Sequence, residues 1–308
     1  MNKRSLKSAL LLMLTALIWG TAFIAQKSGV SHISPNAYNG TRTLLGCMVL
    51  LPVIAFRDGS AKKKGTYKPQ DMRTLVLGGI VCGTLLCIAS TTQSYGLITA
   101  DAGKAGFITA LYIVLVPLFG IFAHKKITPV MWGAVMLALV GLYFLCVRKS
   151  SGFSFGGGEK MLLFCAVMFS LHILAVDYFS PKTDGVKLSC IQFFVSATLN
   201  LVLMFAMGEV PSFADISSCA FAVFYGGVMS CGVAYTLQIV AQKGIDPTVA
   251  SLIMSLESLF ALLAGIAFGE QPSARELFGC RFMMIAIIPF VLIPIKVIQL
   301  IGCVIVIF

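Results

Sequence analysis

The chain has 308 residues, of which 58% are hydrophobic and 11% are charged, and its mean hydropathy is +0.94. Soluble domains carry about 25% charged residues, so this composition excludes a water-soluble globule and predicts an integral membrane protein. The net charge of +11 lies in short loops without interleaved aromatic residues, which favours topology signals and anionic lipid headgroups over a nucleic-acid partner.

The first apolar segment, residues 6–26, follows a basic start, as a signal peptide does. It is longer than the apolar core of such a peptide and carries Trp19 deep inside. It also has no clear cleavage site between small residues. These features predict a first membrane helix that is retained.

Nine further apolar segments follow, each close to the roughly 20 residues that a helix needs to cross a bilayer. In lipid, such a segment satisfies its backbone polar groups only as a helix. We therefore expect an all-α integral membrane protein with ten transmembrane helices. The later nine comprise residues 36–56, 74–97, 104–122, 130–147, 159–179, 188–207, 218–240, 249–268 and 276–295.

A glycine-rich joint at residues 156–158 divides the ten segments into two groups of five. This predicts a first five-helix unit at residues 1–150, a second at residues 159–296, and an apolar C-terminal tail at residues 297–308. Because five is an odd number, two related halves would lie upside down to each other, as inverted repeats do in many secondary transporters.

Basic residues are distributed unevenly between the two ends of the expected helices. With the N-terminus in the cytoplasm, fifteen lysines and arginines lie in inside loops and six in outside loops. This bias predicts that both termini are cytoplasmic. A weak internal repeat, in which residues 100–119 are similar to residues 244–263, agrees with two related halves.

The loops and the cysteines argue against several other classes of protein. No G-x-x-x-x-G-K-[ST] sequence occurs, so the chain has no nucleotide-binding loop of its own. The ten cysteines include no C-x-x-C pair, and only one of three histidines, His172, lies inside an expected helix. We therefore expect no metal site, no cofactor, no disulfide framework and no catalytic residues.

Three ionisable residues stand out among those inside expected helices. Glu257 is near the middle of the ninth, where an ionised carboxylate costs roughly 3 kcal/mol unless paired or hydrated. It either carries a proton or binds a substrate amine, or it is protonated and fixes its helix to a neighbour. Arg42 either binds an anionic substrate group, reaches the outer interface, or pairs with Glu257 or with a helix end. His172 either titrates near neutral pH or is a neutral hydrogen-bonding group.

Neutral polar and aromatic side chains are spread over six of the expected helices. A cavity for a small organic solute needs apolar walls and a few placed polar groups, whereas the alternative for each residue is an interhelical hydrogen bond. The expected substrate-binding residues are Trp19, Asn39, Arg42, Gln93, Tyr95, Tyr112, His172, Gln192, Tyr235, Gln238 and Glu257.

Three stretches carry a family resemblance: ALIWGTAF at residues 16–23, PNAYNGTR at 35–42, and SLESLFALL at 255–263, followed by Gly269-Glu270. In this order and spacing they resemble the EamA-like branch of the drug/metabolite transporter superfamily. The resemblance implies ten helices in two inverted five-helix repeats and movement of small metabolites, often outward.

The last expected helix departs from that family pattern. The family's tenth helix runs from a glycine into a clean aliphatic stretch, whereas here Arg281, Pro289 and Pro294 interrupt it. Proline removes a helix hydrogen bond and kinks the chain. We therefore expect the tenth helix to be atypical.

The favoured function is a secondary transporter in a bacterial cytoplasmic membrane that exports an amino acid-like or drug-like metabolite by alternating access. Coupling to protons is left open, as is the choice between a monomer and a homodimer. The alternative is a non-transporting membrane scaffold or a lipid-handling protein. An intramembrane enzyme would need a nucleophile–base pair or metal ligands on facing helices, which the sequence does not offer.

Overall fold

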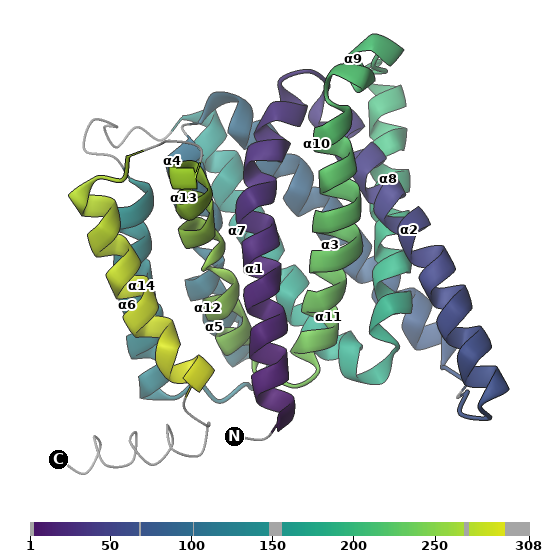
Figure 1. Ribbon diagram of the computed structural model, residues 1–308, viewed down its shortest axis with the longest axis horizontal. Coiled ribbons are helices and arrows are strands. Elements are labelled where there is room, and N and C mark those ends of the chain that lie inside the picture. Colours follow the sequence, from purple (N-terminus) through teal and green to yellow (C-terminus); the bar gives the residue numbers. More distant parts are fainter. Residues whose placement is uncertain (1–2, 68, 101, 148–155, 268–270, 293–308) are drawn as a thin grey trace.

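The computed structural model describes residues 3–67, 69–100, 102–147, 156–267 and 271–292. In these residues the chain is helical throughout (Figure 1), and nine helical segments are long and apolar enough to cross a membrane. The end of the bundle at which α1 begins is called the N-terminal face below, and the opposite end the far face.

The residues before the glycine-rich joint form six helices. Several of these helices begin at a polar N-cap residue. Ser34, Asp71 and Thr128 each accept a hydrogen bond from a free backbone N–H group in the first turn of the helix that follows. The helices are α1 (Lys3–Val30), α2 (Pro35–Lys63), α3 (Met72–Thr99), α4 (Ala102–Thr109), α5 (Tyr112–Phe122) and α6 (Pro129–Cys146).

The residues after the joint form the remaining elements. Asp184 and Asp246 cap α8 and α12 in the same way. The elements are α7 (Gly157–Phe179), η1 (Ser180–Lys182), α8 (Gly185–Ala206), α9 (Phe213–Ser218), α10 (Ala220–Phe224), η2 (Tyr225–Tyr235), α11 (Thr236–Gln242), α12 (Pro247–Met254), α13 (Glu257–Ala267) and α14 (Ala274–Leu292).

Two of the expected spans are interrupted, and a third contains a π-helical segment. The span expected at residues 104–122 divides into α4 and α5 at Ala110–Leu111, and that at residues 249–268 divides into α12 and α13 at Ser255–Leu256. These breaks lie 145 residues apart. This separation differs by one residue from the offset between the two segments of the weak sequence repeat. In the eighth span, the π-helix η2 separates α10 from α11.

The tenth expected span is helical in its described part. It forms α14, which contains Pro289 and packs along α6 at the left of Figure 1. The close approach is between Gly279 and Gly141, where an added Cβ would lie within 3 Å of the other helix's backbone. α14 is not among the nine candidate spans, and residues 293–308, with Pro294 and the expected tail, lie outside the described residues.

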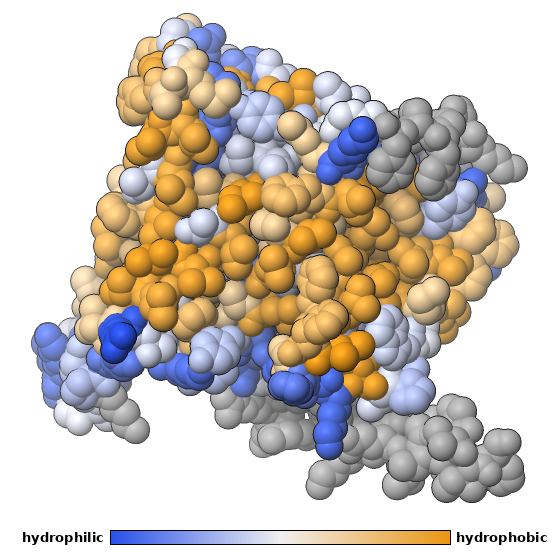
Figure 2. All heavy atoms as spheres, turned by 180° about the vertical axis from the view of Figure 1, so that it is seen from behind, coloured by the Kyte–Doolittle hydropathy of each residue, from blue (hydrophilic) through white to orange (hydrophobic). Residues whose placement is uncertain are grey.

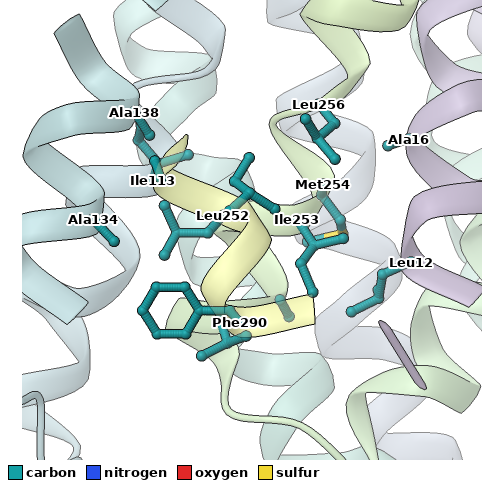
Figure 3. Close-up of a cluster of buried hydrophobic side chains, with 14 of the residues drawn as sticks. Leu12, Ala16, Ile113, Ala134, Ala138, Leu252, Ile253, Met254, Leu256 and Phe290 are labelled. Carbon is teal, nitrogen blue, oxygen red and sulfur yellow. The ribbon is translucent and has the colours of Figure 1, made fainter. Parts of the chain in front are cut away.

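The surface and the core show why these helices form a membrane bundle. Figure 2 shows a broad hydrophobic band across this side of the molecule, with hydrophilic residues gathered along its lower edge, the N-terminal face. Inside, apolar side chains from separate helices pack together (Figure 3). Leu12 of α1, Ile113 of α5, Leu252 of α12 and Phe290 of α14 belong to this buried cluster.

Candidate functional site

A small cavity of about 60 Å³ lies in the middle of the bundle, between the two broken helices. Both halves of the chain contribute to its walls, which are largely aromatic and amide side chains. The lining residues are Trp19, Ala22, Phe23, Gln26, Arg42, Gln93, Thr109, Tyr112, Phe169, His172, Ile173, Ser230, Tyr235, Gln238, Met254 and Glu257. The structure thus brings eight of the eleven expected site residues to one cavity.

The two helix breaks meet at a hydrogen bond. The Tyr112 hydroxyl donates to Glu257 Oε1 over 3.2 Å, and these residues begin α5 and α13 respectively. The N-terminus of a helix carries a partial positive charge, and Glu257 is the first residue of α13. Its Oε2 atom makes no hydrogen bond within the described part of the chain, and the carboxyl group borders the cavity.

Arg42 is 4% exposed and enters the cavity from α2. Its Nε donates to Asn39 Oδ1 over 2.9 Å, and its guanidinium carbon lies 5.4 Å from the centre of the Tyr38 ring. No described carboxylate forms an ion pair with it. In the structure Arg42 is therefore buried beside the cavity and is not paired with Glu257.

His172 is buried and fixed by a neighbouring amide. Its Nε2 lies 3.1 Å from Gln192 Oε1, so Gln192 supports the cavity wall without lining it. The ring of Tyr235 packs edge-on to His172 with ring centres 6.1 Å apart, and lies 4.6 Å from the Trp19 ring. The aromatic groups from α1, α7 and η2 therefore form one continuous wall.

Some buried polar atoms at the cavity have no hydrogen-bond partner within the described ranges. They are the indole nitrogen of Trp19, the hydroxyl oxygen of Thr109 and the amide oxygen of Gln238. The Gln238 amide nitrogen donates to Gln242 Oε1 over 3.1 Å, so only the amide oxygen of Gln238 lacks a partner. Since buried polar groups are nearly always paired, a donor and an acceptor facing the same cavity indicate a place for a polar ligand.

The other expected residues lie closer to the far face. Asn39 donates to Ser94 Oγ over 3.0 Å beside the cavity. Tyr95 is not part of the cavity, because its hydroxyl accepts from Asn36 Nδ2 over 3.0 Å and donates to Glu209 Oε1 over 3.3 Å. This group joins α2, α3 and the segment after α8 at the far face.

Sequence reasoning missed three polar residues that line the cavity, Gln26, Thr109 and Ser230. Gln26 is 6% exposed and donates to Gln93 Oε1 over 3.2 Å. Gln26 is the last residue of the first expected helix, where a polar side chain is ordinary. An amide next to an apolar run can nevertheless indicate an interhelical hydrogen bond. Ser230 lies in the π-helix η2, and the sequence carries no signal that predicts this local geometry.

The cavity widens toward the far face. A second void of about 200 Å³ shares Trp19 and Glu257 with it and continues to Leu145 and Leu262. Those two leucines also line a third void of about 780 Å³ beside the start of α14. Toward the N-terminal face, Met254 and its neighbours in the buried cluster of Figure 3 close the cavity.

The described residues contain no cluster of three or more histidine, cysteine or acidic side chains that would hold a metal ion. The chain matches the model of the EamA-like transporter family over residues 6–147 and again over residues 157–292. The two matches together cover most of the sequence, one on each side of the glycine-rich joint.

Curated relatives agree with this match. A protein named "Uncharacterized transporter" from Archaeoglobus fulgidus is 30% identical over 90% of this chain and 83% of its own length. The "Uncharacterized transporter YoaV" of Bacillus subtilis is 20% identical over 85% of this chain and 89% of its own. A protein of known crystal structure aligns with a TM-score of 0.74 and 18% identity over 92% of this chain and 96% of its own, which shows the fold alone.

Proposed function

The chain belongs to the EamA-like transporter family, and we propose on this premise that it is a secondary transporter for a small polar metabolite, amino acid-like or drug-like. Membership makes it a multi-pass membrane transporter rather than an enzyme. The observation that carries the proposal is the central cavity, because it lies between two broken helices from the two halves and contains unpaired polar groups.

The chemistry of the cavity supports this substrate class. Arg42 offers guanidinium donors to an anionic group, and Glu257 offers an acceptor to an amine. The Trp19–Tyr235 wall suits an apolar or aromatic body between them. Polar side chains that converge on a central cavity also favour transport over the scaffold or lipid-handling alternative, for which they would face lipid or a flat helix seam.

The proposed mechanism is alternating access between two inverted five-helix repeats, with α14 as the tenth helix. The breaks at Ala110–Leu111 and Ser255–Leu256 support it, since they lie at corresponding positions of the two halves. The direction is export across a bacterial cytoplasmic membrane with both termini inside. The domains are residues 1–150 and 159–296, as a monomer or a homodimer.

The test is transport by reconstituted protein. Solutes that raise its melting temperature identify ligands of the folded state, and the best of them is then followed by counterflow and by uptake driven by a pH gradient. For Glu257→Gln we expect pH-driven uptake to fall at least about tenfold. A factor of this size is what the loss of an ordinary coupling free energy between two sites produces. Asp215→Asn is the control, because Asp215 is exposed in α9 and lies outside the central cavity and the two voids next to it.

The two assays separate the possible roles of Glu257. Loss of pH-driven uptake with preserved counterflow assigns it to proton coupling, and loss of both assigns it to substrate binding. Full activity of Glu257→Gln in both assays would remove it from the site. If the wild type gives no counterflow with any stabilising solute, the proposed function itself is wrong.

A further inference from the structure

A second cavity lies away from the central one, at the N-terminal face. It is a groove of about 490 Å³ between the end of α2 and the start of α8, and Arg57, Lys64, Tyr67, Gln70 and Lys187 are among its walls. Its volume far exceeds the roughly 10–15 Å³ that one water molecule requires. The groove therefore has room for the polar group of a ligand.

Two ion pairs hold the walls of this groove together. Arg57 Nη2 lies 3.2 Å from Asp184 Oδ2, and Lys187 Nζ lies 2.6 Å from Asp58 Oδ2. Each pair joins α2 of the first half to the beginning of α8 in the second. Both carboxylates of the groove are thereby engaged, so they do not neutralise the other cations at its rim.

The rim of the groove carries surplus positive charge. Lys62, Lys63 and Lys64 follow one another at the end of α2 and are exposed, and within the described ranges none of them pairs with a carboxylate. Lys62 and Lys187 lie 5.2 and 5.5 Å from the centre of the Tyr67 ring, which holds both cations at the groove. Such a rim favours an anion.

The depth of the groove indicates where the anion comes from. α2 has 29 residues and is therefore about 43 Å long, whereas the hydrocarbon core of a bilayer is about 30 Å thick. The last turns of α2 thus reach the headgroup region. Phe56, which is 79% exposed, lines the groove next to Arg57. A phospholipid would contact both the apolar surface at Phe56 and the cationic rim. Free phosphate would contact only the cationic rim.

We propose that this groove binds the headgroup of an anionic phospholipid, with the phosphate against the rim lysines and an acyl chain along Phe56. The site lies where the two ion pairs join α2 to α8. Bound lipid therefore stabilises the contact between the two halves of the protein at this face.

The test is lipid binding by the purified full-length protein in neutral detergent. Phosphatidylglycerol is titrated in, and the lipid that stays bound is counted by native mass spectrometry. Each basic residue near an anionic lipid contributes about fivefold in affinity, so we expect the triple variant Lys62→Gln, Lys63→Gln, Lys64→Gln to bind at least about tenfold more weakly. Its melting temperature in phosphatidylcholine reports whether the variant is folded.

A second triple variant controls for net charge alone. Lys7→Gln, Lys126→Gln and Lys182→Gln remove the same charge from exposed positions on the same face, outside the groove, and should keep wild-type affinity. Equal weakening in both variants, full binding by the groove variant, or equal binding of phosphatidylcholine would overturn the proposal. Glycerol 3-phosphate binding as tightly as the lipid would assign the groove to a soluble anion instead.

Discussion

Gly83 lies where α3 approaches α8 most closely. A Cβ at this position would be 2.6 Å from the backbone oxygen of Gln192 and 2.7 Å from Val195 Cβ, and a helix backbone cannot move aside as a flexible side chain can. We expect Gly83→Ala to force the two helices apart and to lower the free energy of unfolding by roughly 1–3 kcal/mol. Denaturant unfolding in detergent measures this change.

Gly133→Ala in α6 is the matched control, because a Cβ there meets nothing within 4 Å. Alanine is the better helix former, so this variant should be neutral or slightly more stable than the wild type. Equal destabilisation by both substitutions would show that the α3–α8 contact is not the cause.

At the scale of residues, the sequence indicates which side chains are costly in lipid but not what they contact. Glu257 and Arg42 stand out because they are charged inside apolar segments, and both line the cavity. Their partners do not follow from spacing. Tyr112 is 145 residues from Glu257, and only the packing of the two halves brings them together. Tyr95, like Tyr112, is a tyrosine inside an apolar segment, but it contacts Glu209 at the far face.

The beginning of α8 depends on the charge of Asp184. Burial acts to raise the pKa of this carboxyl, but the backbone N–H of Lys187, the charge of Arg57 and the N–H of Val186 together lower it below the usual value. A lowered pKa means that the folded state gains stability above the unfolded pKa of about 3.9 and loses it as the pH falls through the folded pKa. Asp184 therefore stabilises the protein at neutral pH and not in acid.

We accordingly expect Asp184→Asn to lower the free energy of unfolding at pH 7 by about 1 kcal/mol or less, with the difference from wild type shrinking as the pH falls below the unfolded pKa of about 3.9. Asparagine caps a helix as well as aspartate does, so the substitution isolates the charge. Melting temperatures measured from pH 7 down into acid follow this difference. Asp246→Asn, at a cap without an ion pair among the described residues, is the control, and a difference that stays constant from neutral pH into acid would contradict the argument.

At the scale of elements, long apolar runs predict helices well but hide their interruptions. The breaks at Ala110–Leu111 and Ser255–Leu256 contain neither glycine nor proline, the residues that usually mark an irregular backbone. In a membrane such a break persists only where it borders protein or a cavity. It is therefore a consequence of the assembled bundle, which the sequence of one segment does not contain.

At the scale of the molecule, the all-helical membrane character follows from composition, and the two family matches agree with the division at the glycine-rich joint. The packing of the halves does not follow. α2 and α3 of the first half pack mainly on α7 and α8 of the second, while α6 packs on α14 (Figure 1). The second void lies between these two groups, with Gln93 of α3 and Leu145 of α6 in its walls, whereas α6, α13 and the start of α14 line the third.

This arrangement places the larger voids of the site on the side of the far face. Cys146, which is half-buried, lines the second void together with Glu257, and that void adjoins the third through Leu145 and Leu262. The buried cluster around Met254 blocks the opposite side. We expect a membrane-impermeant thiol reagent to modify Cys146 from the far face of oriented proteoliposomes and not from the N-terminal face.

The measurement uses a Cys280→Ser, Cys303→Ser background, because Cys280 is the other half-buried cysteine among the described residues and Cys303 lies outside them. Adding Cys146→Ser should abolish labelling, since the remaining thiols, such as Cys82 and Cys165 at 0% exposure, are closed to a charged reagent. The adduct should also slow counterflow, because it occupies the void beside Glu257. Equal labelling of Cys146 from both faces would show that the cluster around Met254 does not seal the cavity.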